Sequence, residues 1–349
     1  MKSHYVSGLQ DGQAISCSFL VREKEIRTSP RTGTSWLQLE LGDRTGSIPA
    51  KMWDNFSELA TKFELDDVVQ VRGRVKLYKD QKELTIEQIT PMAERDYDLA
   101  DFLPSTKYDV EQLYSDLRAA IAGMKNPWLK QLLASVVEDP AIAPRLKRAP
   151  AAMMMHHAYL GGLLEHTVGL IGFARSVVEH YPELDGDLLL AGLVLHDIGK
   201  IDELRYVRGF EYTTEGRLLG HIMIGAALVK EKIRTIPQFP ESLAVLVEHL
   251  ILSHHGSMEF GSPALPQTRE AVALHFLDDF DSKMAAMRAT LESPSGSGEW
   301  TDRNPSLRRA LLRSEDFLAG KTGNRESNAP KEVGGRPVSL AAKSPTGRK

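Results

Sequence analysis

A histidine and an aspartate follow one another directly at the end of a strongly apolar stretch, at His196 and Asp197. The eight residues before them are Leu, Ala, Gly and Val, which predicts a buried helix. A buried, ionised Asp beside a His needs a partner, because an uncompensated charge is costly away from water. A divalent metal would serve, since imidazole nitrogen and carboxylate oxygen together suit Mn, Fe, Zn, Co or Ni. The alternative is a plain helix end with polar residues before the glycine at 199.

Further histidines and carboxylates lie beside, or at the ends of, other apolar and helix-like runs. They are His166, His221, the pair His254 and His255, Asp278 and Asp281. Asp278 and Asp281 are three residues apart, so they share one face of a helix. Any of these residues alone is more simply explained as a hydrogen-bonded core residue. Burying all of them without a metal would leave many polar groups unsatisfied, so the whole set favours a metal site.

The composition is that of a globular protein with room for two domains and a tail: 349 residues, 42% hydrophobic and 26% charged. The net charge of −4 excludes a global attraction to nucleic acid, so such binding would need local patches. The single cysteine, Cys17, excludes internal disulfides and a cysteine zinc cluster and fits a reducing compartment. We find no run with the length of a signal-peptide core or a membrane span, and therefore expect a cytoplasmic protein without a membrane partner.

Residues 1–90 have the pattern of a small β domain. Strand-like runs at 15–25, 36–41, 47–53, 68–78 and 83–89 alternate with turn-rich segments, as in a five-stranded barrel of the OB type. Alternation along the strands turns several aromatic and basic side chains outward. These are Trp36, Lys51, Trp53, Arg72, Arg74 and Lys76. Such a surface is typical of single-strand binding; alternatively, the tryptophans cover a barrel end and the basic residues form a solvated strand face.

The rest of the chain divides by periodicity and composition. Residues 91–108 form an acidic linker, 109–155 a helical connector, 156–292 a second helical domain, and 293–319 an extension with a short amphipathic helix over 307–318. Residues 320–349 carry seven basic and two acidic residues, a net charge of +5, and predict a disordered basic tail. The expected fold is α+β and multidomain, with a small all-β barrel followed by an all-α bundle.

The ordered set of His166, His196-Asp197 and Asp278 resembles the HD superfamily of metal-dependent phosphohydrolases. One branch of it, the YhaM-type 3′–5′ exoribonucleases with an OB-type domain in front, is similar over a fuller set of strings: HHAYLGGLLEHT, LAGLVLHDIGK, EGRLLGHI, LILSHHG and HFLDDFDSKM. The similarity covers roughly residues 15–300 and leaves the tail outside.

This resemblance implies two divalent metal ions. The first would be held by His166, His196, Asp197 and Asp278. Asp197 would bridge to a second ion held by His221, His254 and His255. Asp281 would orient a ligand, and His156, His157 and Asp279 are candidates for substrate contact or support, whereas His249 and His275 are expected to be structural. Mixed imidazole and carboxylate ligands favour Mn²⁺.

The implied activity is hydrolysis of single-stranded RNA, with single-stranded DNA as an alternative, from the 3′ end to nucleoside 5′-monophosphates. His196, Asp197 and Lys200 would be the catalytic residues, with Lys200 as a point cation one turn beyond Asp197. The barrel would hold the strand near the helical site, and the resemblance is compatible with a homo-oligomer. Two other functions stay open: an HD-type nucleotide or cyclic-dinucleotide phosphohydrolase, and a non-enzymatic regulator that binds single strands.

Overall fold

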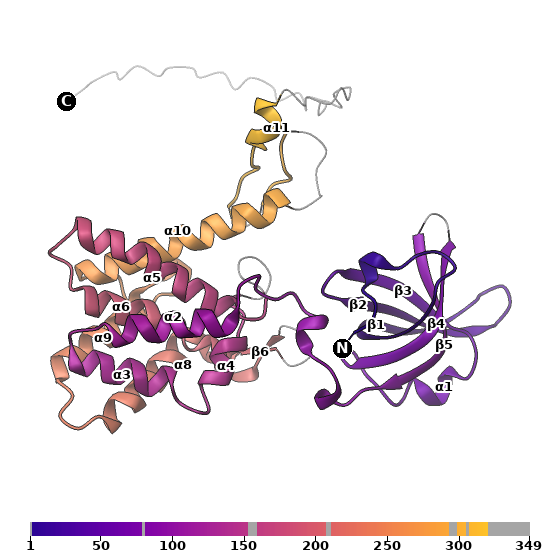
Figure 1. The fold of residues 1–349 in the computed structure, drawn as a ribbon, viewed down its shortest axis with the longest axis horizontal. Coiled ribbons are helices and arrows are strands. Elements are labelled where there is room, and N and C mark those ends of the chain that lie inside the picture. The colour runs from indigo at the N-terminus through magenta and orange to yellow at the C-terminus, as the bar shows by residue number, and fades with distance from the viewer. Residues whose placement is uncertain are drawn as a thin grey trace, which may run out of the picture. The chain divides into compact units, whose positions relative to one another are not determined.

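A computed structural model of the protein describes residues 2–78, 81–152, 159–206, 211–292, 299–304 and 307–319. The chain separates into two compact units, residues 1–289 and 290–349. The first unit contains a β-barrel and then a long series of helices (Figure 1). The expected order of an all-β barrel followed by an all-α region is therefore confirmed.

The barrel closes from five strands in the order β1-β2-β3-β5-β4. The strands are β1 (Ala14–Thr28), β2 (Ser35–Asp43), β3 (Gly46–Met52), β4 (Val68–Tyr78) and β5 (Gln81–Pro91). All neighbours are antiparallel except β3 and β5. A short helix, α1 (Phe56–Leu59), lies between β3 and β4 in sequence, and a 3-10 turn, η1 (Val6–Gly8), precedes β1.

Period-two alternation fills the barrel interior as the sequence predicts. Leu37, Leu39 and Leu41 of β2 are buried, and so are the alternate apolar residues of β3. Gly73 allows β4 and β5 to approach closely, because a Cβ there would lie 2.2 Å from the carbonyl oxygen of Thr85. The register of the two strands shifts at the same place, as in a β-bulge.

Two 3-10 turns, η2 (Glu94–Asp96) and η3 (Leu99–Asp101), lead into the helical region. Its first helices are α2 (Val110–Ala122), α3 (Pro127–Val137) and α4 (Ala143–Arg148). Asn126 caps α3 by accepting hydrogen bonds from the N–H groups of Trp128 and Leu129, and Pro127 takes the first helical position. This is the helix start that the Asn-Pro pair predicts.

The later helices are α5 (Gly162–His180), α6 (Gly186–Leu195), α7 (Lys200–Glu203), α8 (Thr214–Thr235), α9 (Glu241–Ser253) and α10 (Arg269–Glu292). A two-stranded hairpin, β6 (Leu204–Arg205) with β7 (Glu211–Tyr212), interrupts the helical pattern, and a 3-10 turn, η4 (Met258–Phe260), precedes α10. Helix α6 is apolar on nearly every side and lies in the core, where Gly192 faces Leu250 and Leu274. Among the described residues, no helix is both long enough and apolar enough to cross a membrane.

The second unit corrects the helix expected over 307–318, because only α11 (Ser314–Leu318) is helical. Trp300 pairs with Leu312 in a β-bridge, and Asn304 pairs with Arg309. Backbone N–H and C=O groups that would form hydrogen bonds within a helix therefore pair with residues 300–304 instead. Arg308 also has a left-handed φ of 53°. The predicted disordered tail lies outside the described residues.

Candidate metal centre

Two helices, α5 and α10, and the end of a third, α6, bring the predicted ligands of the first ion together. Helix α5 carries His166, His196 and Asp197 directly follow α6, and α10 carries Asp278. His166 Nε2 lies 3.2 Å from Asp278 Oδ1, and His196 Nε2 lies 3.8 Å from the same oxygen. His196 Nε2 is also 3.4 Å from Asp197 Oδ2. His166, His196 and Asp197 each offer a ligand atom within 4.8 Å of the others, close enough to hold one metal ion.

A second group of possible ligands comes from α8 and from the end of α9. His221, His254 and His255 each offer a ring nitrogen within 4.8 Å of the others. Asp197 Oδ1 lies 3.3 Å from His221 Nε2 and 3.7 Å from His254 Nε2. The two oxygens of Asp197 therefore point to different groups of histidines.

Several atoms at this centre are buried without a hydrogen-bond partner in the part of the chain that the structure describes. They are His196 Nε2, Asp197 Oδ1, His221 Nε2 and His254 Nε2. The other ring nitrogen is occupied in two cases: His196 Nδ1 lies 3.0 Å from the Leu193 carbonyl and His254 Nδ1 lies 2.7 Å from the Ile251 carbonyl. A ring that donates from Nδ1 to a carbonyl presents Nε2 as an unprotonated lone pair. Since each unsatisfied buried group costs about 1–3 kcal/mol, these atoms fit divalent cations.

Burial, hydrogen bonds and neighbouring charges shift the pKa values of three residues at this centre, His166, Asp278 and His254. Burial lowers the pKa of His166, but the hydrogen bonds that the ring donates to Asp278 and Asp281 outweigh it and raise that pKa to about 9. Burial opposes ionisation of Asp278, yet its hydrogen bond with His166 holds the Asp278 pKa well below the usual range. Burial, and then the nearby His196, push the pKa of His254 well below its usual value, which keeps this ring neutral and able to ligate.

Lys200 lies one turn beyond Asp197, as the sequence predicts, and the two side chains meet. Its Nζ donates to Asp197 Oδ2 at 2.6 Å. Burial opposes both charges, but their mutual attraction raises the pKa of Lys200 and helps to hold that of Asp197 well below its usual value. The centre therefore contains a fixed cation beside its central carboxylate.

Sequence reasoning missed Glu203, the last residue of α7. Its Oε1 accepts a hydrogen bond from the backbone N–H of His221 at 3.0 Å and lies 3.1 Å from His221 Nδ1. The N–H is available because Gly220, with φ of 72°, breaks α8 at this point. Gly199 lets α7 approach α8, since a Cβ there would lie 2.0 Å from the His221 carbonyl oxygen. The glycine before His221 was the only sequence signal for this arrangement, and it names no partner.

Asp281 contacts a ligand as expected, with Oδ2 2.7 Å from His166 Nδ1. His275 donates from Nδ1 to the His254 carbonyl, and His249 accepts from the Gln267 N–H, so both have structural contacts. Asp279 forms an ion pair with Lys283 and lines a groove with it, and its role in substrate contact or support stays a prediction. His156 and His157 lie outside the described residues.

On the barrel, the two predicted tryptophans lie together. The ring centroids of Trp36 and Trp53 are 5.2 Å apart, and Trp53 is 44% exposed. Lys51 is engaged with Glu83 at 2.5 Å, and Arg74 donates to the Gly12 carbonyl. Arg72, Arg74 and Lys76 are exposed along β4. The barrel thus has an aromatic pair on β2 and the end of β3, and a row of basic side chains on β4.

Comparisons with known proteins match both parts of the chain. Residues 20–92 match the family of the OB-fold nucleic acid binding domain, and residues 163–283 match the HD domain. The 3′-5′ exoribonuclease YhaM of Bacillus velezensis is 34% identical over 293 residues, which is 84% of this chain and 92% of that protein. YhaM of Bacillus subtilis is 33% identical over 286 residues, which is 82% of this chain and 90% of that protein. The similarity therefore includes the barrel and the helices that carry the histidine–aspartate cluster.

Proposed function

This chain belongs to the YhaM family of metal-dependent 3′–5′ exoribonucleases, and we propose that its histidine–aspartate cluster holds two divalent ions for hydrolysis of single-stranded RNA. The observation that carries this proposal is the place of Asp197 between two groups of histidines, beside buried nitrogens that lack a hydrogen-bond partner among the described residues. A shared carboxylate is what two neighbouring cations need to approach each other.

The ligands divide between two ions. We assign His166, His196, Asp197 and Asp278 to the first, and Asp197, His221, His254 and His255 to the second. Asp281 and Glu203 bind the far side of His166 and His221, respectively, and so direct Nε2 of each ring into the centre. Mn²⁺ suits this mixture of imidazole and carboxylate.

Bound divalent ions would activate water and neutralise charge on the scissile phosphate. The protein contributes Lys200, a buried cation fixed on Asp197 that can offset the negative charge that develops on the phosphoryl oxygens. His254, neutral because of burial and the nearby His196, can keep its ligand role without losing a proton. Cleavage of the bond to the 3′ oxygen of the preceding nucleotide would release a nucleoside 5′-monophosphate and leave a shortened strand with a 3′-hydroxyl.

The barrel supplies the contacts that a polymer needs. Trp36 and Trp53 can stack on bases, and Arg72, Arg74 and Lys76 can contact phosphates. Neither kind of contact uses the 2′-hydroxyl, so single-stranded DNA is a second expected ligand. A nucleotide or cyclic-dinucleotide phosphohydrolase would not need such a surface. We further propose that the protein is a homo-oligomer. We also propose that it works in the cytoplasm, because the single Cys17 fits a reducing compartment.

The test uses single-stranded RNA and DNA labelled at either end, incubated with Mn²⁺, Mg²⁺ or a chelator, beside nucleoside triphosphates and cyclic dinucleotides. We expect shortening of RNA from the 3′ end, and its loss with the chelator. Asp197→Asn should abolish hydrolysis while RNA binding persists, and the control Asp116→Asn, on the exposed side of α2, should stay active. Substantial activity of Asp197→Asn, or faster turnover of the small nucleotides than of RNA, would overturn the proposal.

A further inference from the structure

A basic groove lies on the helical domain beside the metal centre. It has a volume of about 880 Å³, and its walls are α4, the segment from α7 into β6, and the chain that follows β5 (Figure 1). Four arginines and two aspartates are its charged lining residues: Arg95, Arg145, Arg148, Arg205, Asp98 and Asp202. The lining therefore has a net charge of +2, although the whole chain has a net charge of −4. A positive groove on an acidic protein favours an anionic ligand.

Arg148 is the arginine of this groove that is best placed to contact such a ligand. Its side chain is exposed and forms no ion pair with any residue that the structure describes. Arg145 is instead held by both carboxylate oxygens of Asp202. Arg205 pairs with Glu211 at 2.6 Å. Because a guanidinium group presents several N–H donors in one plane, Arg148 can contact two oxygens of a phosphate at once.

Two tyrosines line the groove beside the arginines. Tyr97 is half-buried, and its ring meets Phe102 edge to face at 5.5 Å, which fixes the ring in place. Tyr206 is buried, and its hydroxyl donates to the Arg145 carbonyl at 3.0 Å. Proteins bind single-stranded nucleic acid by stacking bases on aromatic rings and by pairing phosphates with cations. The groove has both kinds of side chain.

Helix α7 joins this groove to the metal centre. Lys200 and Glu203, at its two ends, contact residues of the centre. Ile201 and Asp202, between them, line the groove. A helix of four residues is about 6 Å long, so the groove and the centre lie against the same short element.

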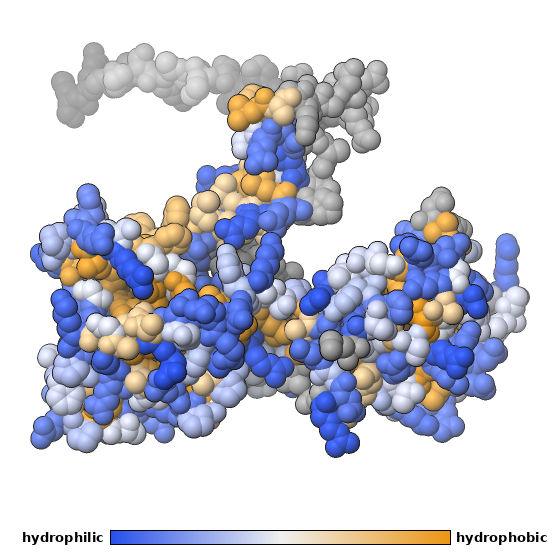
Figure 2. All heavy atoms as spheres, viewed as in Figure 1, coloured by the Kyte–Doolittle hydropathy of each residue, from blue (hydrophilic) through white to orange (hydrophobic). Residues whose placement is uncertain are grey.

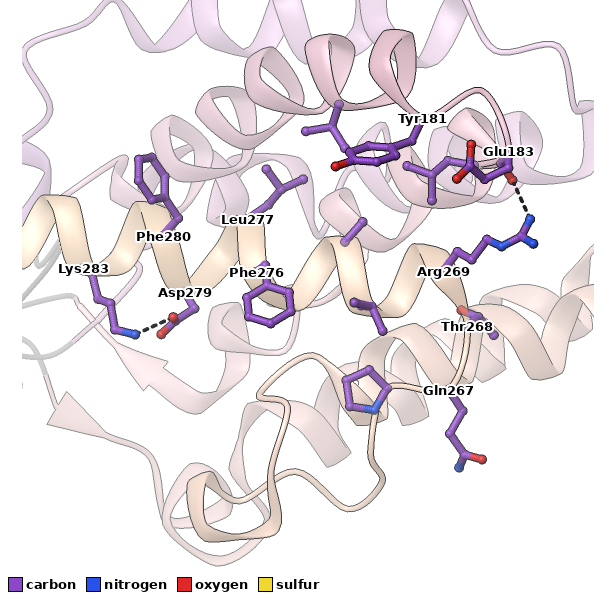
Figure 3. Close-up of a pocket in the computed structure, with 15 residues that line it drawn as sticks. Tyr181, Glu183, Gln267, Thr268, Arg269, Phe276, Leu277, Asp279, Phe280 and Lys283 are labelled. Carbon is purple, nitrogen blue, oxygen red and sulfur yellow. Dashed lines mark hydrogen bonds and ion pairs between the residues drawn. The ribbon is translucent and has the colours of Figure 1, made fainter.

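A second large groove, along α10, is less suited to a nucleic acid strand. It has a volume of about 940 Å³, and Figure 3 shows Phe276 and Phe280 among the residues around it. Figure 2 shows hydrophobic residues along α10. The two cations of this groove already have contacts, Lys283 with Asp279 and Arg269 with a backbone carbonyl (Figure 3). Phosphates therefore find a better site in the basic groove.

We propose that the basic groove binds the RNA strand upstream of the nucleotide that is removed, with Arg148 on a phosphate and Tyr97 on a base. This rests on the proposed function, because it requires the 3′ end of the strand at the metal centre. The strand then runs from the centre past α7, through the groove and toward Arg95, which is four residues after β5 ends at Pro91. A substrate too short to reach from the centre to Arg148 gains nothing from the groove.

The test compares Arg148→Gln with the wild type on a long and a short substrate. Single-stranded RNA of about 12 nucleotides is used as a ligand, in fluorescence anisotropy with a chelator, and as a substrate with Mn²⁺. The short substrate is bis-p-nitrophenyl phosphate. We expect Arg148→Gln to lower both RNA affinity and kcat/KM about tenfold, with kcat and turnover of the short substrate unchanged. The slope of log affinity against log salt concentration should fall by about 0.7, the value for one phosphate contact on a single strand. Arg148→Lys, which keeps the charge, should recover part of the affinity.

Arg175→Gln is the matched control, because Arg175 is also exposed and has no ion-pair partner among the described residues, but lies on α5 outside the groove. Unchanged RNA affinity in Arg148→Gln, or the same loss in Arg175→Gln, would overturn the proposal. An equal loss on the short substrate would show that Arg148 supports the metal centre and not the strand. Inhibition of the wild type by a nucleoside monophosphate that Arg148→Gln removes, with RNA affinity unchanged, would make the groove a site for free nucleotides. A wild type that binds RNA through Arg148 without hydrolysing it would contradict the proposed function and leave the groove as a strand-binding site.

Discussion

Replacing Glu203 by Gln should weaken metal binding although Glu203 is not a ligand. Its carboxylate accepts from the His221 N–H at 3.0 Å and from His221 Nδ1 at 3.1 Å. The second contact turns His221 Nε2 toward Asp197 Oδ1, which is 3.3 Å away. Glutamine has nearly the same shape but no charge, so the change leaves the geometry in place and removes the electrostatic part of the contact.

The magnitude follows from the kind of hydrogen bond that is lost. Burial opposes ionisation of Glu203, but its hydrogen bond with His221 lowers the Glu203 pKa, so the carboxylate is charged at neutral pH. A hydrogen bond to a charged group contributes about 1.5–3 kcal/mol and a neutral one about 0.5–1.5 kcal/mol. The difference, about 1–2 kcal/mol, corresponds to roughly 5–30-fold in metal affinity. Residues that orient metal ligands typically contribute about 10–100-fold.

The assay is titration calorimetry of Mn²⁺ into the metal-free protein, followed by hydrolysis of RNA at limiting and at saturating Mn²⁺. We expect Glu203→Gln to raise the metal Kd about tenfold and to regain most activity when Mn²⁺ is in excess. Glu270→Gln is the matched control: both glutamates are 8% exposed, and Glu270 accepts from the backbone N–H of Asp185, on a different loop. It should lower the melting temperature without changing metal affinity.

Two results would refute this reasoning. If Glu203→Gln and Glu270→Gln had the same metal affinity, the contact to His221 would not direct a ligand. If excess Mn²⁺ failed to restore the Glu203→Gln variant, the carboxylate would act on the reaction itself and not through His221.

Three further changes have outcomes that the structure sets. Trp36→Ala with Trp53→Ala should weaken binding of long oligonucleotides by about 10–100-fold, measured by fluorescence anisotropy, and spare a small model phosphodiester; equal loss on both would show that the rings support the fold. The raised pKa of His166, about 9 against an ordinary 6.5, stabilises the metal-free protein below about pH 6.5, and that stabilisation is lost as pH rises through about 9. Metal affinity should rise over the same window, because a ligand must be neutral, and calorimetry in two buffers would detect the released proton. Gly199→Ala should lower both melting temperature and metal affinity, because its Cβ would lie 2.0 Å from a backbone oxygen, whereas Gly172→Ala, with nothing within 4 Å, should be neutral or stabilising by up to about 1 kcal/mol.

The elements that the sequence predicts well are those whose pattern is local. Leu37, Leu39 and Leu41 alternate with polar neighbours, and they fill the barrel. Asn126 with Pro127 marks the start of α3, because both the side-chain cap and the fixed φ act within one turn. His196 and Asp197 could be expected at a metal centre because they end a helix that is apolar on nearly every side.

Contacts between distant segments could not be predicted in the same way. In the sequence, Glu203 is one more charged residue at a helix end. Its contact depends on the break of α8 at Gly220, which exposes the backbone N–H of His221 to the Glu203 carboxylate. Residues 307–312 have helical spacing of leucines, yet pairing with 300–304 takes their backbone groups. Asp279 directly follows Asp278, but one residue is a turn of about 100° on a helix, so the Asp279 side chain pairs with Lys283 while Asp278 contacts His166.

The arrangement of the ligands links metal binding to the fold of the whole helical domain. His166 and Asp278 are far apart in sequence, and their contact of 3.2 Å exists only when α5 and α10 are both in place. Without ions, Nε2 of His196 and Nε2 of His254, which have no hydrogen-bond partner among the described residues, remain buried, and their desolvation is not offset. Ion binding satisfies those atoms only in the folded chain, so its free energy adds to the stability of that state. The apolar surroundings strengthen the electrostatic interactions of Asp197 with its neighbours. The same surroundings make it costly to bury the polar atoms of the centre when no metal ion is bound.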